Sequence, residues 1–419
     1  MRRLAVLSFH TSPLVQPGVG DSGGMNVYVR ELVSALAQAG VACDVYTRAW
    51  SPDLPTEVVV EPGFRVVHVD AGPRAEVAKE ELAALVPAFA EGVIDHLRAT
   101  GETDAIHANY WLSGVAGHLV KHALGLPLVS TFHTLARVKA EAAEAEPSDR
   151  IEAEAEVIRC CDAILANCSE EAADLRRHYD APADRIEIVA PGVDHAFFSP
   201  GDRGGARAAL GWAEPGRISA SGGRGAAAHP VLLFVGRIQP LKGLDVAVRA
   251  LAALPHETAE LVVVGGPSGA GGAAELARVQ SLVSELGLVE RVRFVDPQPH
   301  HLLSTWYRAA DVVLVPSRSE SFGLVALEAA ACGTPVVAAA VGGLRTLVDH
   351  GSTGFLVQGR RPEAYAAYVA ELLDNPVLAA EMSSRATAKA AGYTWSIAAA
   401  RLRRIYTDLA ARSLVEDCS

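Results

Sequence analysis

Two cations stand beside glycines in the segment from Gly236 to Gly243, directly after an apolar run. Arg237 offers a planar fork of N–H donors and Lys242 offers a point charge, and together such groups can neutralise a diphosphate. The glycines allow a tight strand-to-helix turn, and the helix that follows would aim its N-terminal N–H groups at the same anion. The segment therefore predicts a site for an anionic ligand. Two solvated cations on a loop are the alternative interpretation.

Two carboxylates, Glu320 and Glu328, stand eight positions apart and flank a helix start that contains Gly323. Each carboxylate can accept hydrogen bonds from hydroxyl groups, and the backbone N–H groups of residues 321–324 would face a ligand at the helix N-terminus. Capping of the helix by Ser319 or Ser321, with both glutamates exposed, is the alternative. Taken with the two cations, the pair indicates a site that holds a nucleotide diphosphate and the sugar attached to it.

A glycine pair opens the first predicted helix, in the run Asp21-Ser22-Gly23-Gly24-Met25-Asn26. Glycine permits close approach of the backbone, and the helix dipole favours a phosphate or a polar sugar there. His10 follows the first predicted strand and so belongs to a loop that would face a ligand. A tight turn explains the glycine pair equally well, and a lone histidine such as His10 is more often a structural residue.

Three further candidates follow other predicted strands of the N-terminal half: Tyr110, His133 and Thr134. His133 would donate a hydrogen bond to a sugar hydroxyl or lie near the reacting centre. Lys79 and Arg150 are cations that would meet an anionic acceptor. Because Arg150 lies in a glutamate-rich predicted helix, a surface ion pair is an equally good interpretation of it.

Apolar runs that alternate with helical patterns predict an α/β fold with two doubly wound, mostly parallel sheets. We expect domains at 1–195 and 200–392 that face each other across a cleft, with a C-terminal helix over 396–415 packing back on the first. A stretch rich in glycine, alanine and serine, 213–229, is predicted to be a flexible insertion. The predicted strands are Leu4–Phe9, Val41–Tyr46, Val66–Val69, Ala105–His107, Leu128–Thr131, Ala163–Ala166, Ile186–Val189, Val231–Val235, Leu261–Val264, Val292–Val295, Val312–Val315 and Pro335–Ala338.

Composition excludes several classes of protein. The net charge of −12 over 419 residues argues against nucleic-acid binding, and no apolar run is long enough to span a membrane. Six cysteines form no C-x-x-C pair, which favours reduced thiols and a cytoplasmic location. No metal-ligand spacing is evident, since the adjacent His300 and His301 would not converge on one ion.

These motifs resemble those of the retaining GT-B glycosyltransferases, in the family that contains the sucrose-phosphate synthases. Within it, the chain is most similar to the D-inositol 3-phosphate glycosyltransferases of mycothiol biosynthesis, above all in the runs His10–Gly18 and Gly20–Tyr28. The resemblance implies transfer of a sugar, N-acetylglucosamine from UDP-N-acetylglucosamine, onto 1D-myo-inositol 3-phosphate. It also implies a front-face mechanism in which the donor phosphate accepts the acceptor's proton, with no protein nucleophile.

The resemblance further implies the role of each matching residue. The catalytic residues would be Arg237, Lys242, Glu320 and His133. The donor would be bound by Gln16, Pro17, Gly24, Arg237, Lys242, Gln298, Glu320, Ser321, Phe322, Gly323, Leu324 and Glu328, the last through the ribose. The acceptor would be bound by His10, Asp21, Asn26, Lys79, Tyr110, Thr134 and Arg150. The UDP-sugar is a co-substrate, catalysis requires no cofactor, no motif indicates a structural magnesium ion, and a homodimer is compatible with the resemblance.

Departures from the family pattern leave the acceptor open. They occur at Asn109, Phe132, Arg137 and Arg345, and the run that begins at Arg150 is closer to the sucrose-phosphate-synthase branch. Another sugar phosphate or polyol is therefore the alternative acceptor. A catalytically silent sugar-nucleotide-binding protein and a non-hydrolysing epimerase are alternatives from other classes. Both halves of the donor motif are intact, which argues against the first, and no acid–base set is present for the second.

Overall fold

The structure, a computed structural model, describes residues 2–18, 20, 22–101, 103–141, 147–212, 229–269 and 271–415. The chain divides into two compact units. Unit 1 comprises Met1–Val15, Gly24–Gly192 and Trp395–Ser419, and unit 2 comprises Gln16–Gly23 and Val193–Thr394. Asp21 and most of the glycine-rich stretch, 213–228, lie outside the described residues.

Unit 1 is built on an eight-stranded sheet in the order β3-β4-β2-β1-β5-β6-β7-β8. All neighbouring strands are parallel except the edge pair β3 and β4, which is antiparallel. Its elements are β1 (Arg3–Leu7), α1 (Gly24–Gln38), β2 (Ala42–Arg48), β3 (Glu57–Glu61), β4 (Phe64–Val69), η1 (Lys79–Leu85), α2 (Val86–Thr100), β5 (Ala105–Asn109), α3 (Trp111–Leu124), β6 (Leu128–Thr131), α4 (Ala136–Glu141), α5 (Ser148–Cys160), β7 (Ala163–Ala166), α6 (Ser169–Tyr179), η2 (Ala183–Arg185), β8 (Ile186–Ile188) and α15 (Trp395–Ala410).

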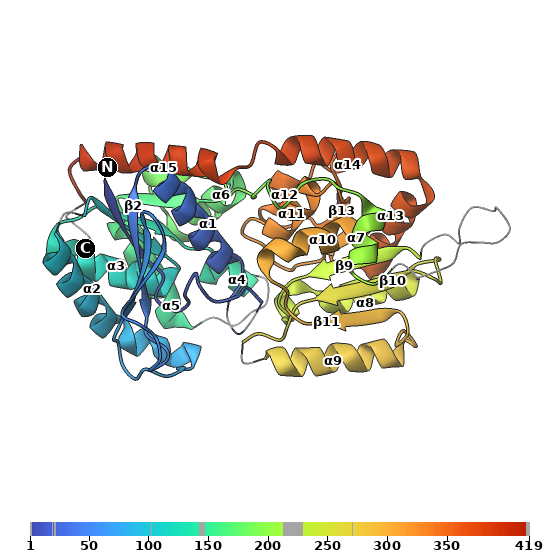
Figure 1. The fold of residues 1–419 in the computed structure, drawn as a ribbon, viewed down its shortest axis with the longest axis horizontal. Coiled ribbons are helices and arrows are strands. Elements are labelled where there is room, and N and C mark those ends of the chain that lie inside the picture. Colours follow the sequence, from blue (N-terminus) through green and yellow to red (C-terminus); the bar gives the residue numbers. More distant parts are fainter. Residues whose placement is uncertain are drawn as a thin grey trace. The chain divides into compact units, whose positions relative to one another are not determined.

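Helices cover both faces of this sheet, as expected for parallel strands. Because side chains alternate along a strand, Leu4 and Val6 of β1 join a core with α1 and α15, whereas Ala5 and Leu7 join the opposite core with α2, α3 and α5. Figure 1 shows α15 (red) running beside α1 (blue), and the two helices are in contact. The C-terminal helix α15 therefore belongs to unit 1, together with the N-terminal strand β1.

A buried histidine ties α15 to the sheet. His107 of β5 is 1% exposed, and its Nε2 lies 2.8 Å from Oγ1 of Thr131 while its Nδ1 lies 2.8 Å from the hydroxyl of Tyr406. Burial lowers the pKa of His107 to about 3. The imidazole is therefore neutral in the folded protein at physiological pH, with one ring nitrogen donating and the other accepting.

We expect this histidine to make unit 1 sensitive to acid. The unfolded chain binds a proton at His107 below about pH 6.5, but the folded protein does not until about pH 3. The stability that depends on a neutral ring is therefore complete above pH 6.5 and is lost as the pH falls, by about 2 kcal/mol at pH 5. Urea denaturation at pH 7 and pH 5 should show a smaller difference for His107→Gln than for the wild type. Equal differences for the two proteins would contradict this assignment.

Glu171 changes the free energy of unfolding in the opposite direction to His107 over the same range of pH. Its burial raises its pKa to about 7, so the folded protein keeps a proton there that the unfolded chain loses above pH 4.5. That contribution is present below pH 4.5 and is lost as the pH rises towards 7. Because Glu171 is unchanged in His107→Gln, its effect cancels when the variant is compared with the wild type.

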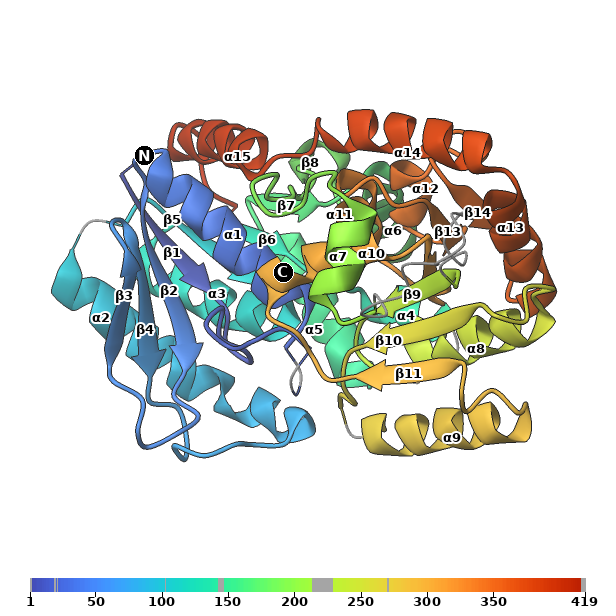
Figure 2. The ribbon, with the colours of Figure 1, turned by 45° about the vertical axis from the view of Figure 1, so that its right-hand side comes forward.

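Unit 2 contains a six-stranded parallel sheet in the order β11-β10-β9-β12-β13-β14. One face is covered by α8, α9 and α13, which share a core with β9 and β10; Figure 2 shows β9, β10 and β11 in a row. Its elements are α7 (Arg203–Ala209), β9 (Val231–Val235), η3 (Pro240–Lys242), α8 (Leu244–Ala253), β10 (Glu260–Val264), α9 (Gly272–Glu285), β11 (Val292–Val295), η4 (His300–Leu302), α10 (Leu303–Ala309), β12 (Val312–Val315), α11 (Leu324–Ala331), β13 (Val336–Ala339), α12 (Leu344–Leu347), β14 (Phe355–Val357), α13 (Pro362–Asp374) and α14 (Pro376–Ala390).

The carboxyl edge of each sheet carries the candidate residues. In unit 2, the loops after β9 and β12 leave neighbouring parallel strands at the same edge. In unit 1, the loops after β1, β5 and β6 do the same. Ligands of open α/β sheets bind at such edges. Among the described helices, none is long and apolar enough to cross a membrane.

Candidate active site

The two motifs of unit 2 meet in a direct ion pair. Nζ of Lys242 lies 2.7 Å from Oε2 of Glu320, although the residues are 78 positions apart in sequence. The hydroxyl of Ser317 donates to the same carboxylate oxygen at 3.1 Å. The two side chains of the ion pair are 23% and 16% exposed, so the pair is partly buried and not free in solvent. The alternative of a solvated Lys242 on a loop is therefore not supported.

The turn that carries Lys242 is held against the loop that carries Glu320. Gly243 follows Lys242 with φ of +71°, and a Cβ at this position would lie 2.2 Å from the carbonyl oxygen of Pro316. Only glycine fits this close approach and this backbone angle. The N–H of Arg318 donates to the carbonyl of Leu241 at 2.8 Å, which adds a second link between the two loops. These two backbone contacts hold the two loops together and so keep Lys242 beside Glu320.

Glu328 is buried and already paired. The residue is 5% exposed, its Oε1 lies 2.7 Å from Nε2 of His300, and its Oε2 accepts a hydrogen bond of 2.7 Å from the hydroxyl of Tyr307. Tyr307 is fully buried, and burial followed by the nearby Glu328 raises its pKa well above 10. A carboxylate retains further lone pairs when each oxygen accepts one bond. The alternative of an exposed Glu328 is wrong.

Helix α11, which follows Glu320 and contains Glu328, begins without a side-chain cap from its N-cap residue. Gly323, with φ of +103°, is the N-cap residue of α11, and Leu324 is its first residue. The N-cap residue is therefore neither Ser319 nor Ser321. Phe322 is 3% exposed and packs beside the ring of Tyr393, with centroids 6.0 Å apart. The first turn of α11 has backbone N–H groups that no intrahelical acceptor satisfies, as in any helix.

The described part of the run 16–23 belongs to unit 2 and not to the N-terminal domain in which the sequence analysis placed it. Nε2 of Gln16 donates to the carbonyl of Pro297 at 3.0 Å, next to Gln298 after β11. Gln298 itself donates to the carbonyl of Asp296 at 2.9 Å. The predicted donor residues Gln16, Pro17 and Gln298 are thus brought to one edge of unit 2.

In unit 1, four predicted acceptor residues form a connected series. The rings of His10 and Tyr110 lie 4.4 Å apart, and the guanidinium of Arg150 lies 5.2 Å from the centre of the Tyr110 ring. Nη2 of Arg150 donates to the carbonyl and to the hydroxyl of Thr134, at 3.0 and 3.1 Å. A series of contacts therefore links His10 to Thr134 through Tyr110 and Arg150.

Arg150 is not a surface residue. It is 4% exposed, and its Nε donates at 2.8 Å to Glu154, which is completely buried. The interpretation of Arg150 as a surface ion pair is wrong in its location, because the pair is internal. A buried carboxylate beside the guanidinium balances its charge, and it orients the side chain towards Thr134.

His133 has a strained backbone and a defined partner. Its φ is +61°, which is uncommon outside glycine, and its Nε2 lies 2.9 Å from Oδ1 of Asn109 at the end of β5. Burial, with a smaller effect of His107, lowers the pKa of His133 to about 3. The neutral ring therefore donates through Nε2 to Asn109 and can accept through Nδ1. The expectation that His133 donates to a sugar hydroxyl is not supported.

Other predicted acceptor residues have structural contacts or lie outside the description. Nδ2 of Asn26, which is 2% exposed, donates to Oγ1 of Thr11 and to the carbonyl of Ser12, at 2.6 and 2.7 Å. Gly24 begins α1. Lys79 begins η1, but its side chain lies outside the described atoms, and so does the whole of Asp21.

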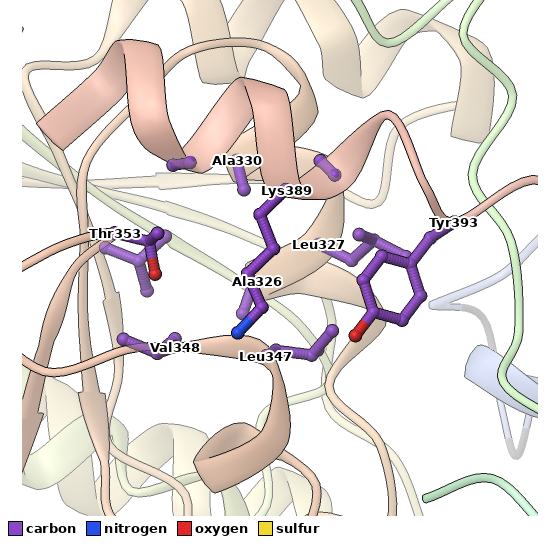
Figure 3. A pocket seen from close by; sticks show the side chains of 11 residues that line it. Ala326, Leu327, Ala330, Leu347, Val348, Thr353, Lys389 and Tyr393 are labelled. Carbon is purple, nitrogen blue, oxygen red and sulfur yellow. The ribbon is translucent and has the colours of Figure 1, made fainter.

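A small pocket in unit 2 lies away from these residues. It lies between α11 and α14 and is lined mainly by apolar side chains, among them Ala326, Leu327 and Ala390 (Figure 3). Its one charged residue, Lys389, donates to the carbonyl of Thr346 at 2.8 Å and pairs with a carboxylate, Asp349, at 2.9 Å. None of the predicted site residues lines it, and we assign it no ligand.

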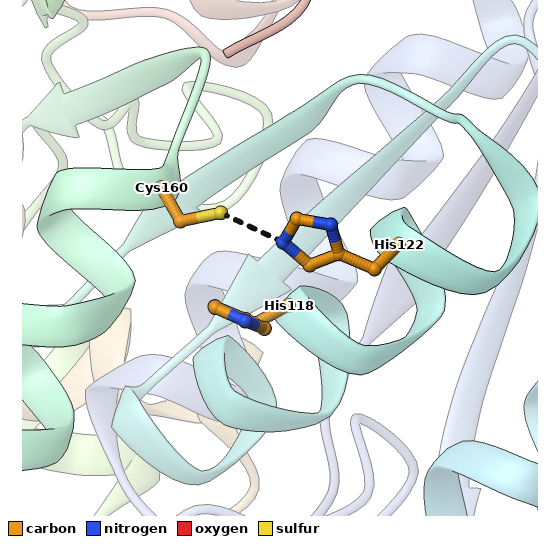
Figure 4. A group of neighbouring side chains, drawn as sticks. All are labelled: His118, His122 and Cys160. Carbon is orange, nitrogen blue, oxygen red and sulfur yellow. Dashed lines mark hydrogen bonds between the residues drawn. The ribbon is translucent and has the colours of Figure 1, made fainter. Parts of the chain in front are cut away.

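A histidine pair on α3 was not among the residues predicted from the sequence. His118 and His122 lie one helical turn apart, and with Cys160 they place three ligand-type atoms within 4.8 Å of one another (Figure 4). The spacing i, i+4 could have revealed the pair. Cys160 is disulfide-bonded, however, so its sulfur is not a thiolate ligand and we assign no metal to the group.

The expectation of reduced thiols throughout is wrong for Cys160. Four cysteines have reduced thiols and are buried: Cys43, Cys161, Cys168 and Cys332. Cys160 is disulfide-bonded, and the remaining cysteine, Cys418, lies outside the described residues. Cysteine spacing alone does not predict which thiols are close enough in space to bond.

Two family profiles match the chain. The profile of Glycosyltransferase Family 4 matches residues 22–197, and that of Glycosyl transferases group 1 matches residues 225–389. A D-inositol 3-phosphate glycosyltransferase of Thermobispora bispora is 45% identical, over 97% of this chain and 95% of its own length. One of Streptomyces scabiei is 46% identical, over 97% of this chain and 91% of its own length.

Solved structures share the fold. The sucrose-phosphate synthase of Thermosynechococcus elongatus matches with a TM-score of 0.90 and 32% identity, over 98% of this chain and 100% of that chain. Anabaena HepE in complex with UDP-glucose matches with a TM-score of 0.76 and 20% identity, over 97% of this chain and 100% of that chain. At that identity the second match supports the fold alone.

Proposed function

Since the chain belongs to the D-inositol 3-phosphate glycosyltransferases, a family with the GT-B fold, we propose that it transfers N-acetylglucosamine from UDP-N-acetylglucosamine to 1D-myo-inositol 3-phosphate with retention of configuration. The observation that carries the proposed chemistry is the contact of Lys242 with Glu320 at the carboxyl edge of unit 2. It joins a cation for the diphosphate to a carboxylate for the sugar. The relatives are named as D-inositol 3-phosphate glycosyltransferases, which supports the proposed acceptor.

In the proposed reaction, the bond between the sugar C1 and the diphosphate oxygen breaks while a bond from C1 to an inositol oxygen forms on the same face. The proton of that hydroxyl passes to the departing diphosphate, so no protein nucleophile is required. Arg237 and Lys242 compensate the negative charge that develops on UDP. Glu320 and the N–H groups at the start of α11 contact the sugar, and Glu328 contacts the ribose.

For the acceptor, we propose that Arg150 and Thr134 bind the phosphate, with Tyr110 and His10 beside the inositol ring. The connected contacts among these four residues support this assignment. Arg150 is already paired with Glu154, so the phosphate would add a second charge-assisted contact to the guanidinium. An unphosphorylated acceptor lacks that contact and should be a poorer substrate.

Release of UDP from UDP-N-acetylglucosamine, measured with and without 1D-myo-inositol 3-phosphate, tests the proposal. UDP should appear only when the phosphorylated acceptor is present, and the product should be the α-anomer by NMR. Free inositol serves as the matched control and should be a poor acceptor. Failure to release UDP with any acceptor, while UDP still binds, would favour a silent binding protein.

A second acceptor class has a specific observation in its favour, namely the 32% identity and TM-score of 0.90 to a sucrose-phosphate synthase. The same assay with sugar phosphates in place of the inositol phosphate distinguishes the two classes. Higher kcat/KM for a sugar phosphate than for 1D-myo-inositol 3-phosphate would overturn the proposed acceptor and leave the chemistry of the donor unchanged.

Removing the hydroxyl of Tyr307 should weaken donor binding. This hydroxyl and His300 hold the two oxygens of Glu328, so Tyr307→Phe leaves one oxygen without its buried donor. We expect the KM for the UDP-sugar to rise about tenfold, since one neutral hydrogen bond that orients a charged acceptor is worth about 1.5 kcal/mol. Steady-state kinetics with varied donor measures this.

Tyr365→Phe is the matched control for that variant. Tyr365 is also buried in unit 2, at 1% exposed, and its hydroxyl has no hydrogen-bond partner among the described residues. Its KM for the donor should equal that of the wild type. An unchanged KM in Tyr307→Phe would show that the orientation of Glu328 does not matter for the donor.

Turnover should survive a chelator. If Arg237 and Lys242 supply the positive charge that a divalent metal supplies in other glycosyl transfers, EDTA removes nothing that the reaction needs. Initial rates with and without 5-fold excess EDTA over total divalent metal, roughly the amount needed for complete chelation, should agree within error. Complete loss of the rate in EDTA would refute this claim.

A further inference from the structure

The space occupied by the guanidinium of Arg237 depends on the absence of a side chain at Gly23. A Cβ built on Gly23 would lie 3.0 Å from Nε, 3.3 Å from Cζ and 3.5 Å from Cδ of Arg237. Both residues belong to unit 2. The first two distances are shorter than ordinary van der Waals contacts, so the arginine would have to move if any larger residue replaced the glycine.

Backbone conformation does not explain a glycine at this position. Eighteen other glycines of the described chain have positive φ, Gly18 and Gly20 in the same loop among them, but Gly23 is not one of them. A positive φ is therefore not what requires a glycine at this position. What the glycine provides is room, and the group that uses this room is Arg237.

The loop around Gly23 is anchored by contacts that do not involve Arg237. Gln16 donates to the carbonyl of Pro297, and the N–H of Gly18 donates to the carbonyl of Ser22 at 2.9 Å. A Cβ at Gly266 would lie 3.2 Å from the carbonyl oxygen of Gly18, so the loop lies directly against the turn after β10. Ser22 is 3% exposed. A side chain at position 23 would accordingly displace the arginine and not the loop.

We propose that Gly23 is a positioning residue for Arg237, which sets where the guanidinium meets the diphosphate of the UDP-sugar. This inference rests on the proposed role of Arg237 in donor binding. The atoms nearest to the added methyl group belong to the end of the arginine side chain, which can adopt other staggered rotamers. A methyl group at position 23 should therefore move the charge from its binding position and leave the fold intact.

A double-mutant cycle on UDP binding tests the proposal. The variants are Gly23→Ala, Arg237→Ala and the double variant, with the dissociation constant of UDP measured by isothermal titration calorimetry. We expect Gly23→Ala to raise this constant at least tenfold, with a melting temperature equal to that of the wild type. The double variant should bind UDP no more weakly than Arg237→Ala alone, because the methyl group then has no guanidinium to displace.

Gly271→Ala is the matched control. Gly271 is in unit 2, its φ of −95° suits any residue, and no heavy atom of the described residues beyond its chain neighbours lies within 4 Å of a Cβ built there. Its affinity for UDP should be that of the wild type.

Each other outcome overturns a stated part of the proposal. Wild-type UDP affinity in Gly23→Ala refutes the positioning role, and so do independent, multiplicative effects in the double variant, which would mean that Gly23 acts on the ligand directly. If Gly23→Ala unfolds and the double variant unfolds as well, the added methyl group disrupts the loop and does not displace the arginine. That result also refutes the positioning role. Wild-type affinity in Arg237→Ala, in contrast, refutes the proposed function of Arg237 itself.

Discussion

Replacing Lys242 by alanine is expected to lower kcat by roughly 10³-fold while the protein remains folded. The ammonium group lies at the carboxyl edge of unit 2 and would compensate the charge that grows on the departing diphosphate. It also holds Glu320 at 2.7 Å, so its loss leaves that carboxylate with only Ser317 among the contacts described here for its side chain. Two features of the proposed transition state therefore depend on one side chain. Steady-state kinetics with saturating donor and acceptor measures the loss.

A matched lysine separates this effect from a general loss of charge. Lys389 also pairs with a carboxylate in unit 2, Asp349 at 2.9 Å, but outside the candidate site. Lys389→Ala should keep the wild-type kcat. Both variants should lose no more than about 1 kcal/mol of unfolding free energy, because each ion pair is partly open to solvent. Near-normal kcat in Lys242→Ala would remove this residue from the mechanism.

Much of the fold could be predicted because parallel strands buried on both faces are continuous apolar runs. The predicted strands Leu128–Thr131, Ala163–Ala166 and Val231–Val235 have the observed bounds, and the two doubly wound sheets are confirmed. Two strands were missed. β3 is an edge strand in which Val59 is 73% exposed, so it lacks a buried pattern, and β14 has three residues, which is too short for any periodicity.

The candidate site could be predicted as separate motifs but not as contacts. Lys242 and Glu320 were each identified from their neighbours in sequence, but nothing local indicates that they touch across 78 positions. His300 was considered only as a metal ligand, yet its partner is Glu328 on α11. The described part of residues 16–23 belongs to unit 2 because it packs against Pro297. The spacing of apolar residues along the chain does not indicate such a tertiary contact.

The ion pair of Arg150 in unit 1 is a second contact that could not be predicted from the sequence. A glutamate-rich helix is most often a solvated face, and sequence alone could not choose between a surface ion pair and a buried one. Glu154 is the glutamate that turns inward: it accepts from Arg150 at 2.8 Å, from the N–H of Ala136 at 2.9 Å, and from the hydroxyl of Tyr179. Burial and then this carboxylate raise the pKa of Tyr179, which therefore stays protonated and donates.

Replacing Glu154 by leucine is therefore expected to lower the free energy of unfolding by about 3–5 kcal/mol, because the buried guanidinium loses its partner. Urea denaturation measures the change. Glu156→Leu is the matched control on the same helix: its side chain is 59% exposed, its contact with His118 is 3.9 Å, and its cost should stay within about 0.5 kcal/mol. Equal costs for the two variants would contradict an internal ion pair at Arg150.

Removing both charges separates the structural role of Arg150 from its role towards the acceptor. In Arg150→Met/Glu154→Leu no buried charge is left unpaired, so this variant should be more stable than Glu154→Leu alone. If Arg150 binds the acceptor phosphate, the folded double variant should still show a rise of about 10²-fold in the KM for 1D-myo-inositol 3-phosphate, the loss expected when a charge-assisted contact is removed. Its KM for the UDP-sugar should not change. A double variant that regains stability and keeps the wild-type KM for the acceptor would mean that the buried pair serves folding alone.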